Sequence, residues 1–334
     1  MAQGKSSRNT LSFLLKVLVT VGVLWFVIGK LGWQNILSTV EHANWHWLLV
    51  AELVFIFSSV VGVVQWKLLL DNRGMKVSFW RALVLYFVGL LFNNIMLGMV
   101  TGDAVKIAML KNDGGSGTGR LSLAATFLDR IAGLWAMMAF AMIGSVILFH
   151  HGLSSVNSHI ETAAAALAVT FVGFCGICVV IISQRAQKMV FALIEMMPLP
   201  GKEKIRDIVS ELFIEVHDRH ILLPVICLSS VVQITRIAVH ILCAASLGIL
   251  TADNFQYFFV FVPMTAIIML VPFPFGVREV IAGGLFAMAG FRSDAALVMQ
   301  FLATLVVLAT SVFSGLLFLS SHFSEGGAKP NGES

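Results

Sequence analysis

Long apolar runs constrain this chain more than any other feature of its sequence. A helix that crosses a bilayer needs about 20 consecutive, mostly apolar residues. Runs of that length cover residues 11–29, 45–70, 123–149, 161–183, 220–248 and 294–319. Hydrophobic residues make up 58% of the 334 residues and charged residues only 12%, which argues against a soluble globular domain. The sequence therefore predicts an all-α polytopic membrane protein with about six full spans.

Two further apolar stretches are interrupted by residues that a membrane span avoids. Residues 80–101 contain Asn93 and Asn94, and residues 255–290 contain the sequence VPFPFGVRE. Basic residues lie both before and after the first stretch, and basic loops favour the cytoplasmic side. We therefore expect residues 80–110 to enter the membrane from the cytoplasm, break and return. By the same reasoning, residues 255–290 form a re-entrant hairpin from the outer side, with its break at Pro272–Gly276.

These assignments give two halves with the same plan, residues 11–149 and 161–319. Each half has two spans, a broken hairpin and a final span, and the halves have opposite orientation. Such an inverted-topology repeat is typical of secondary transporters. We expect one transmembrane domain over residues 1–320, with both termini in the cytoplasm of a bacterial cell and the chain in its inner membrane. Residues 202–219 have the spacing of an amphipathic interfacial helix, and residues 321–334 form a disordered polar tail.

The two breaks are candidate binding sites, because irregular backbone at membrane depth survives only where protein buries it or water reaches it. The helix that begins after each break presents free N–H groups, which suit an anion such as phosphate. Asp103 has a structural alternative as a helix N-cap. Gly276 allows a positive φ or a close backbone approach at the second break. The candidate residues at the breaks are Asn93, Asn94, Gly102, Asp103, Lys106, Gly276, Arg278 and Glu279.

Ionisable residues inside the spans are the other candidates, since their burial in lipid is costly. Asp129 and Arg130 lie in the 123–149 run, and Arg236 lies in the 220–248 run. Arg130 either neutralises a buried carboxylate or contacts a ligand. Arg236 has no acidic residue on its own run, so it either reaches Asp129, Asp103 or Glu279 across the bundle or meets an anion. We expect both hairpins to meet near the midplane and to form one headgroup cavity.

Other kinds of site are poorly supported. Cys175 and Cys178 form a C-x-x-C, but they lie in an apolar run without flanking ligands, so we predict no metal and no cofactor. The sequence has no G-x-S-x-G, H-E-x-x-H or Walker motif, and we expect no enzyme activity. The net charge of +4 is distributed over loops between apolar runs, which favours lipid headgroups over nucleic acid as the partner.

Several of these residues together resemble the lysylphosphatidylglycerol synthase transmembrane region family, whose members are also called flippase-like membrane proteins. The resemblance covers residues 11–320. It departs from the family pattern at Gly98–Asp103, where GMVTGD replaces a proline followed by Gly-Gly-Asp, and at Lys106, where arginine is usual. The matching residues are Asn93 or Asn94, Gly102-Asp103, Lys106, Asp129-Arg130-Ile131-Ala132-Gly133-Leu134, Pro272, Gly276, Arg278-Glu279 and the segment QWKLLL at Gln65–Leu70.

The resemblance implies the lipid-translocating part of such synthases, because the sequence shows no aminoacyl-transfer domain. Family members accompany glycolipid, polyprenyl-phosphate and hopanoid pathways. We expect a lipid transporter whose cations bind a phosphate-bearing headgroup of a phospholipid, a polyprenyl phosphate or another anionic lipid. One alternative is an accessory subunit that binds lipid for a lipid or glycolipid synthase without moving it. A third is a membrane-embedded transferase that uses Asp103 or Asp129 as a base.

Overall fold

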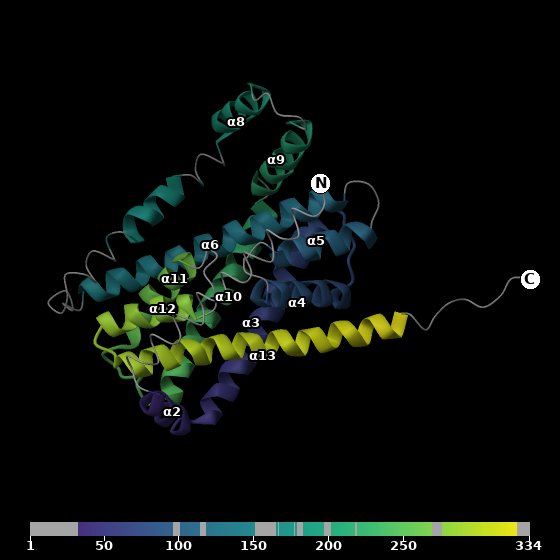
Figure 1. Ribbon diagram of the computed structural model, residues 1–334. Helices are drawn as coiled ribbons and strands as arrows, with labels where there is room; N and C mark the ends of the chain where they lie inside the picture. Colours follow the sequence, from purple (N-terminus) through teal and green to yellow (C-terminus); the bar gives the residue numbers. More distant parts are fainter. Residues whose placement is uncertain are drawn as a thin grey trace, which may run out of the picture. The chain divides into compact units, whose positions relative to one another are not determined.

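The computed structural model describes residues 33–95, 101–113, 118–150, 167–176, 183–196, 202–217, 219–268 and 276–325, with residues 165 and 178 (Figure 1). Within these residues every regular element is a helix. Four helices contain stretches long and apolar enough to span a membrane: α3 (Trp45–Asn72), α6 (Thr118–His150), α10 (Arg219–Ser246) and α13 (Ser293–Glu325). The predicted all-α membrane fold is therefore confirmed, and apolar helices of spanning length cover most of the predicted spans at 45–70, 123–149, 220–248 and 294–319.

Other expected segments fall partly or wholly outside the described residues. The run 11–29 lies outside them, as do residues 96–100 at the first break and residues 269–275, including Pro272, at the second. Of the disordered tail expected at 321–334, residues 321–325 instead belong to α13, and residues 326–334 lie outside the described residues. The run 161–183 is represented by a shorter apolar helix at Leu167–Gly176. The full number of spans and the inverted repeat stay predictions.

The chain forms two compact units. Unit 1 lies within Met1–Val54, Ala139–Ala168 and Arg236–Val306, and unit 2 lies within Phe55–Met138, Val169–Thr235 and Val307–Ser334. Four of the five boundaries fall inside α3, α6, α10 and α13, so each of these helices contributes one segment to each unit. The fifth falls inside the shorter apolar helix Leu167–Gly176.

In unit 2, α4 (Phe79–Ile95) and α5 (Thr101–Asp113) pack against each other as a helical hairpin. Two glycines allow their backbones to touch. A Cβ at Gly102 would overlap the backbone oxygen of Gly89 and lie 2.7 Å from its carbonyl carbon. Only glycine fits this crossing, because any side chain at position 102 would meet backbone rather than a flexible group. The broken helix expected over residues 80–110 thus has two helical arms in direct contact.

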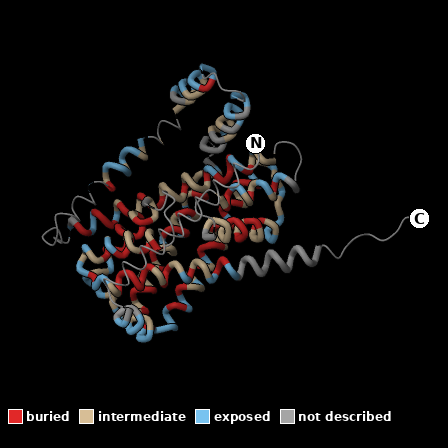
Figure 2. The backbone as a smooth tube through the Cα atoms, viewed as in Figure 1, coloured by how far each residue is buried: buried red, intermediate tan, exposed pale blue. Residues whose placement is uncertain are grey.

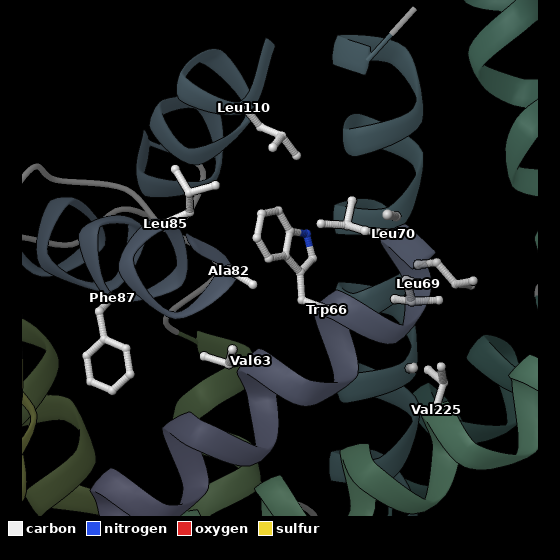
Figure 3. Close-up of a cluster of buried hydrophobic side chains, with 12 residues drawn as sticks. Val63, Trp66, Leu69, Leu70, Ala82, Leu85, Phe87, Leu110 and Val225 are labelled. Atoms are coloured by element: carbon white, nitrogen blue, oxygen red, sulfur yellow. The ribbon is translucent and has the colours of Figure 1, made fainter. Parts of the chain in front are cut away.

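The core of unit 2 is built around Trp66 of α3, which is fully buried. Figure 3 shows its ring between side chains from neighbouring helices, including Leu85 of α4 and Leu110 of α5. Its indole N–H donates to the hydroxyl of Thr126 on α6 at 3.0 Å. A buried indole needs such a partner for its polar edge. Trp66 therefore ties α3 to α6 by a hydrogen bond and to the α4–α5 hairpin by packing.

Unit 1 contains a second apolar hairpin, α11 (Phe258–Ile268) and α12 (Val277–Met288), preceded by the short helix η2 (Phe255–Tyr257). Rings of Phe258, Phe261, Phe286 and Phe291 contact one another at centroid distances of 5.0–5.9 Å. Most of these contacts are edge-to-face, the arrangement that aromatic quadrupoles favour. The cluster packs α12 against α11 through aromatic contacts.

Three helices lie outside the predicted membrane segments. Residues 30–44, between the first two apolar runs, contain α2 (Trp33–Glu41), and the segment between the run 161–183 and residues 202–219 contains α8 (Gln184–Met196). The predicted amphipathic helix is present as α9 (Lys202–His217). Figure 2 shows that exposed residues predominate on α8, in contrast to the buried segments of α3 and α6.

Candidate functional site

A bidentate ion pair between α5 and α6 forms the centre of the candidate site in unit 2. Arg130 donates from Nε to Asp103 Oδ2 at 2.8 Å and from Nη2 to Asp103 Oδ1 at 3.0 Å. Asp103 is the third residue of α5, where a negative charge also favours the helix dipole. Of the two roles considered for Arg130, neutralising a buried carboxylate is therefore present. Its side chain nevertheless remains 37% exposed, so it is also accessible to a ligand.

Lys106 lies behind this pair, one turn further along α5. Its ammonium is 3.2 Å from Asp103 Oδ1 and is otherwise buried. The Nζ atom lies 4.7 Å from the centroid of the Trp66 ring and 5.3 Å from that of Tyr86. Aromatic faces attract a cation in this range. Because protein encloses the ammonium, the geometry favours a role for Lys106 in holding Asp103 rather than in direct ligand contact.

Asp129, the neighbour of Arg130 on α6, faces α3. Gln65 donates from Nε2 to Asp129 Oδ1 at 2.8 Å. A carboxylate only accepts hydrogen bonds, so Asp129 fixes the orientation of the Gln65 amide. In that orientation Gln65 Oε1 is buried and has no donor among the residues that the structure describes. An unmatched buried acceptor of this kind costs about 1–3 kcal/mol.

Asn93 joins the two arms of the α4–α5 hairpin. The backbone N–H of Gly102 donates to Asn93 Oδ1 at 2.8 Å. This amide belongs to the first turn of α5, where N–H groups have no partner inside the helix. Asn93, rather than Asp103, therefore satisfies it, and Asp103 is left to its ion pairs. Asn94 lies at the end of α4, and its side chain is outside the described residues.

The charges of the site are balanced. Asp103 and Asp129 carry two negative charges, and Lys106 and Arg130 carry two positive ones. A balanced, hydrogen-bonded group of charges is tolerated in a low-dielectric environment, whereas a single unpaired charge is not. The contacts also join α3, α5 and α6, so the same side chains that form the site hold these helices together.

The second hairpin has an acidic site of its own, in unit 1. Glu279 is the third residue of α12 and is 1% exposed. It accepts from the N–H of Gly276 at 2.6 Å, from Arg278 Nε at 2.6 Å and from the hydroxyl of Thr304 at 2.9 Å. Gly276 has φ of +89°, which confirms the predicted positive φ and explains why glycine is required there.

The two hairpins therefore share a local arrangement. In each, an acid at the third position of the second helix binds a side chain from the helix that follows. The partner is Arg130, 27 residues after Asp103, or Thr304, 25 residues after Glu279. Each site lies within its own unit. This parallel is in line with the predicted repeat, which stays a prediction.

Arg236 belongs to unit 1, where it is half-buried on α10. Its carbonyl oxygen accepts from Nδ1 of His240 at 3.0 Å, one turn later. The sequence did not single out Tyr86, Thr126 or Thr304. These are ordinary residues in apolar runs, and only their partners in space show a role. Gln65 and Trp66 gave a signal, since both lie in the segment QWKLLL.

Comparison with known proteins assigns the chain to a family. Over 131 residues it is 28% identical to a UPF0104 membrane protein of Pyrococcus horikoshii, an alignment that covers 38% of this chain and 39% of that protein. The chain thus matches well under half the length of that relative. The sequence pattern of one family extends over residues 13–322, which include all the site residues described above. This chain belongs to the family of the lysylphosphatidylglycerol synthase transmembrane region.

Proposed function

We propose that this protein binds the phosphate of a membrane lipid headgroup at Arg130 and moves that lipid across the bilayer. The observation that carries the proposal is the guanidinium of Arg130, which lies on a candidate membrane span. Two of its nitrogens donate to Asp103, and its side chain is still 37% exposed. An ionisable residue within a span is a functional candidate by default. Membership of a family named for lysylphosphatidylglycerol synthases supports a lipid as the ligand.

The geometry supports binding by exchange of partners. A bidentate carboxylate and a bidentate phosphate present similar oxygen pairs to a guanidinium. Asp103 binds Arg130 on two nitrogens and neutralises its charge. When a phosphate takes over Arg130, Asp103 retains its ion pair with Lys106. The carboxylate is therefore not left without a partner, and the exchange avoids the large penalty of an isolated buried charge.

The binding step is tested with phosphatidic acid and diacylglycerol that have the same acyl chains and differ in the phosphate. Native mass spectrometry of the purified protein gives the affinity for each. Arg130→Gln should weaken phosphatidic acid binding at least about tenfold and leave diacylglycerol unchanged. Arg130→Lys should recover only part, because lysine keeps the charge and loses the bidentate geometry.

The matched control is Arg120→Gln. Arg120 lies on the same helix and is similarly exposed, but it pairs with Asp207 of α9 at 2.8 Å. Its replacement should leave phosphatidic acid binding unchanged. Equal affinities for the wild type and for Arg130→Gln would contradict the proposed site.

The transport step needs a separate measurement in liposomes that contain a fluorescent phospholipid. Dithionite bleaches only the fluorophores in the outer leaflet, so the bleached fraction reports movement between leaflets. With the wild type, dithionite should bleach more than half of the signal. With Arg130→Gln, the rate of lipid movement between the leaflets should be lower. Lipid binding without any movement would refute transport and would favour the accessory-subunit alternative.

A further inference from the structure

The helix α8 has one face fixed against the rest of unit 2. The ring of Phe191 contacts that of Phe213 on α9 at a centroid distance of 5.6 Å. Ile194 is buried as well. The ring contact and the burial of Ile194 together indicate which side of α8 turns away from the protein.

The opposite side of α8 carries an exposed stripe, named here the α8 stripe: Arg185, Lys188, Met189, Leu193 and Met196. At 100° per residue these positions fall within about 140° of arc, with Ile194 on the far side. Met189, Leu193 and Met196 are 67%, 60% and 80% exposed. The stripe is therefore apolar toward the end of the helix and basic toward its start.

The helix itself does not stabilise the positive charges of Arg185 and Lys188. Arg185 and Lys188 lie in the first turns of α8, where the helix dipole disfavours positive charge. Neither has an acidic partner among the described residues. The charges therefore fit an anion outside this part of the protein.

The chain places α8 close to a membrane surface. Gln184 follows the apolar helix Leu167–Gly176 by eight residues, and α9 leads at once into the candidate span His220–Ser246. Eight extended residues reach at most about 30 Å. The α9 helix is also tied to the ends of α3 and α6, by Arg73 with Glu211 and by Arg120 with Asp207. The α8–α9 hairpin is thus attached at several points to helices that span the membrane.

We infer that the α8 stripe lies on an anionic lipid leaflet. Met189, Leu193 and Met196 enter the boundary between headgroups and acyl chains, and Arg185 and Lys188 contact lipid phosphates. An in-plane helix with apolar residues beside Arg and Lys has the composition that such binding requires. This surface is separate from Arg130, and its role does not depend on the transport of lipid.

The native methionines report on the contact, because a sulfur exposed to water is oxidised faster than one buried in lipid. The full chain is placed in nanodiscs of phosphatidylglycerol or of phosphatidylcholine and treated with hydrogen peroxide. Peptide mass spectrometry then gives the oxidation rates of Met189 and Met196. In phosphatidylglycerol both should react more slowly than in phosphatidylcholine and far more slowly than methionine in a free peptide.

Two single substitutions separate the charge contribution. Lys188→Gln should raise both oxidation rates in phosphatidylglycerol up to about fivefold, the effect of one basic residue at an anionic surface. Lys202→Gln removes an exposed charge from α9, outside the stripe, and should leave the rates unchanged. Rates in phosphatidylglycerol close to those of a free peptide would overturn the inference and leave the face to a protein partner. Rates that do not respond to Lys188→Gln would overturn the role of the charges.

Discussion

Gly102→Ala tests the contact between the two arms of the first hairpin. The added methyl group would meet the backbone of Gly89, with its carbonyl carbon at 2.7 Å, and the side chain of Asn93, with Cγ at 2.8 Å. Ordinary contact between carbon atoms requires about 3.5–4.0 Å, and the carbonyl oxygen of Gly89 lies nearer still, so α5 must move away from α4 by more than about 1 Å. Backbone cannot rotate aside as a flexible side chain does. The movement would also disturb Asp103, the next residue, and its two bonds to Arg130.

The expected cost follows from two opposing contributions. Overpacking of a tight contact destabilises a protein by about 1–3 kcal/mol. Replacement of glycine by alanine also restricts the unfolded chain, which stabilises by about 0.4–1 kcal/mol where the site is compatible. Gly284→Ala is the matched control, since Gly284 lies within α12 and a Cβ there meets nothing within 4 Å. Because the restriction of the unfolded chain is common to both variants and cancels, we expect Gly102→Ala to be about 1–3 kcal/mol less stable than Gly284→Ala.

The assay is equilibrium unfolding of both variants in the same detergent micelles, followed by circular dichroism. Lipid binding measured by native mass spectrometry gives a second readout, because displacement of Asp103 should alter the Arg130 site. Equal stability of the two variants would show that the backbones of α4 and α5 do not touch at this point.

Further substitutions at three charged contacts are tested by the same unfolding measurement. Asp103→Asn should cost about 3–5 kcal/mol, because it leaves two cations without their shared carboxylate, and Arg130→Gln in the same chain should recover part of that loss; a double variant less stable than the single one would contradict the pairing. Glu279→Gln should cost about 3 kcal/mol, because a nearly unexposed carboxylate loses its charge-assisted bonds, and an unchanged midpoint would exclude those bonds. Glu211→Gln should cost more than Asp207→Asn, which should stay below about 1 kcal/mol, because the Asp207 ion pair is the more exposed. The reverse order would show that exposure does not decide the strength of these two pairs.

The long spans could be predicted because length and apolar content are visible in the sequence without any knowledge of packing. A prediction based on long apolar runs does not find the shorter helices α2 and α8. An amphipathic helix mixes charges with apolar residues, so a search for apolar runs passes over it. The spacing of Met189, Leu193 and Met196 was available, and a search for helical periodicity over residues 184–196 would have found it.

The candidate site was only half visible in the sequence. Asp103, Arg130 and Glu279 could be predicted as site residues, because ionisable residues among apolar ones are rare and costly. Their hydrogen-bond partners could not be predicted from the sequence. Arg130 had several carboxylates within reach, and its pairing with Asp103 depends on how α5 and α6 pack. Thr304 gave no signal, since threonine is common in apolar helices and its bond to Glu279 spans 25 residues.

The order of the adjacent residues Asp129 and Arg130 reflects which neighbouring helix each side chain faces. Adjacent residues on a helix point about 100° apart, so α6 presents a negative charge to α3 and a positive charge to α5. The paired substitution Asp129→Arg and Arg130→Asp keeps the composition, the hydropathy and the net charge of the segment. It would nevertheless turn a carboxylate toward that of Asp103 and a cation toward the amide that now donates to a carboxylate. The order of the two letters therefore records on which side of α6 each neighbouring helix lies, information that composition alone does not contain.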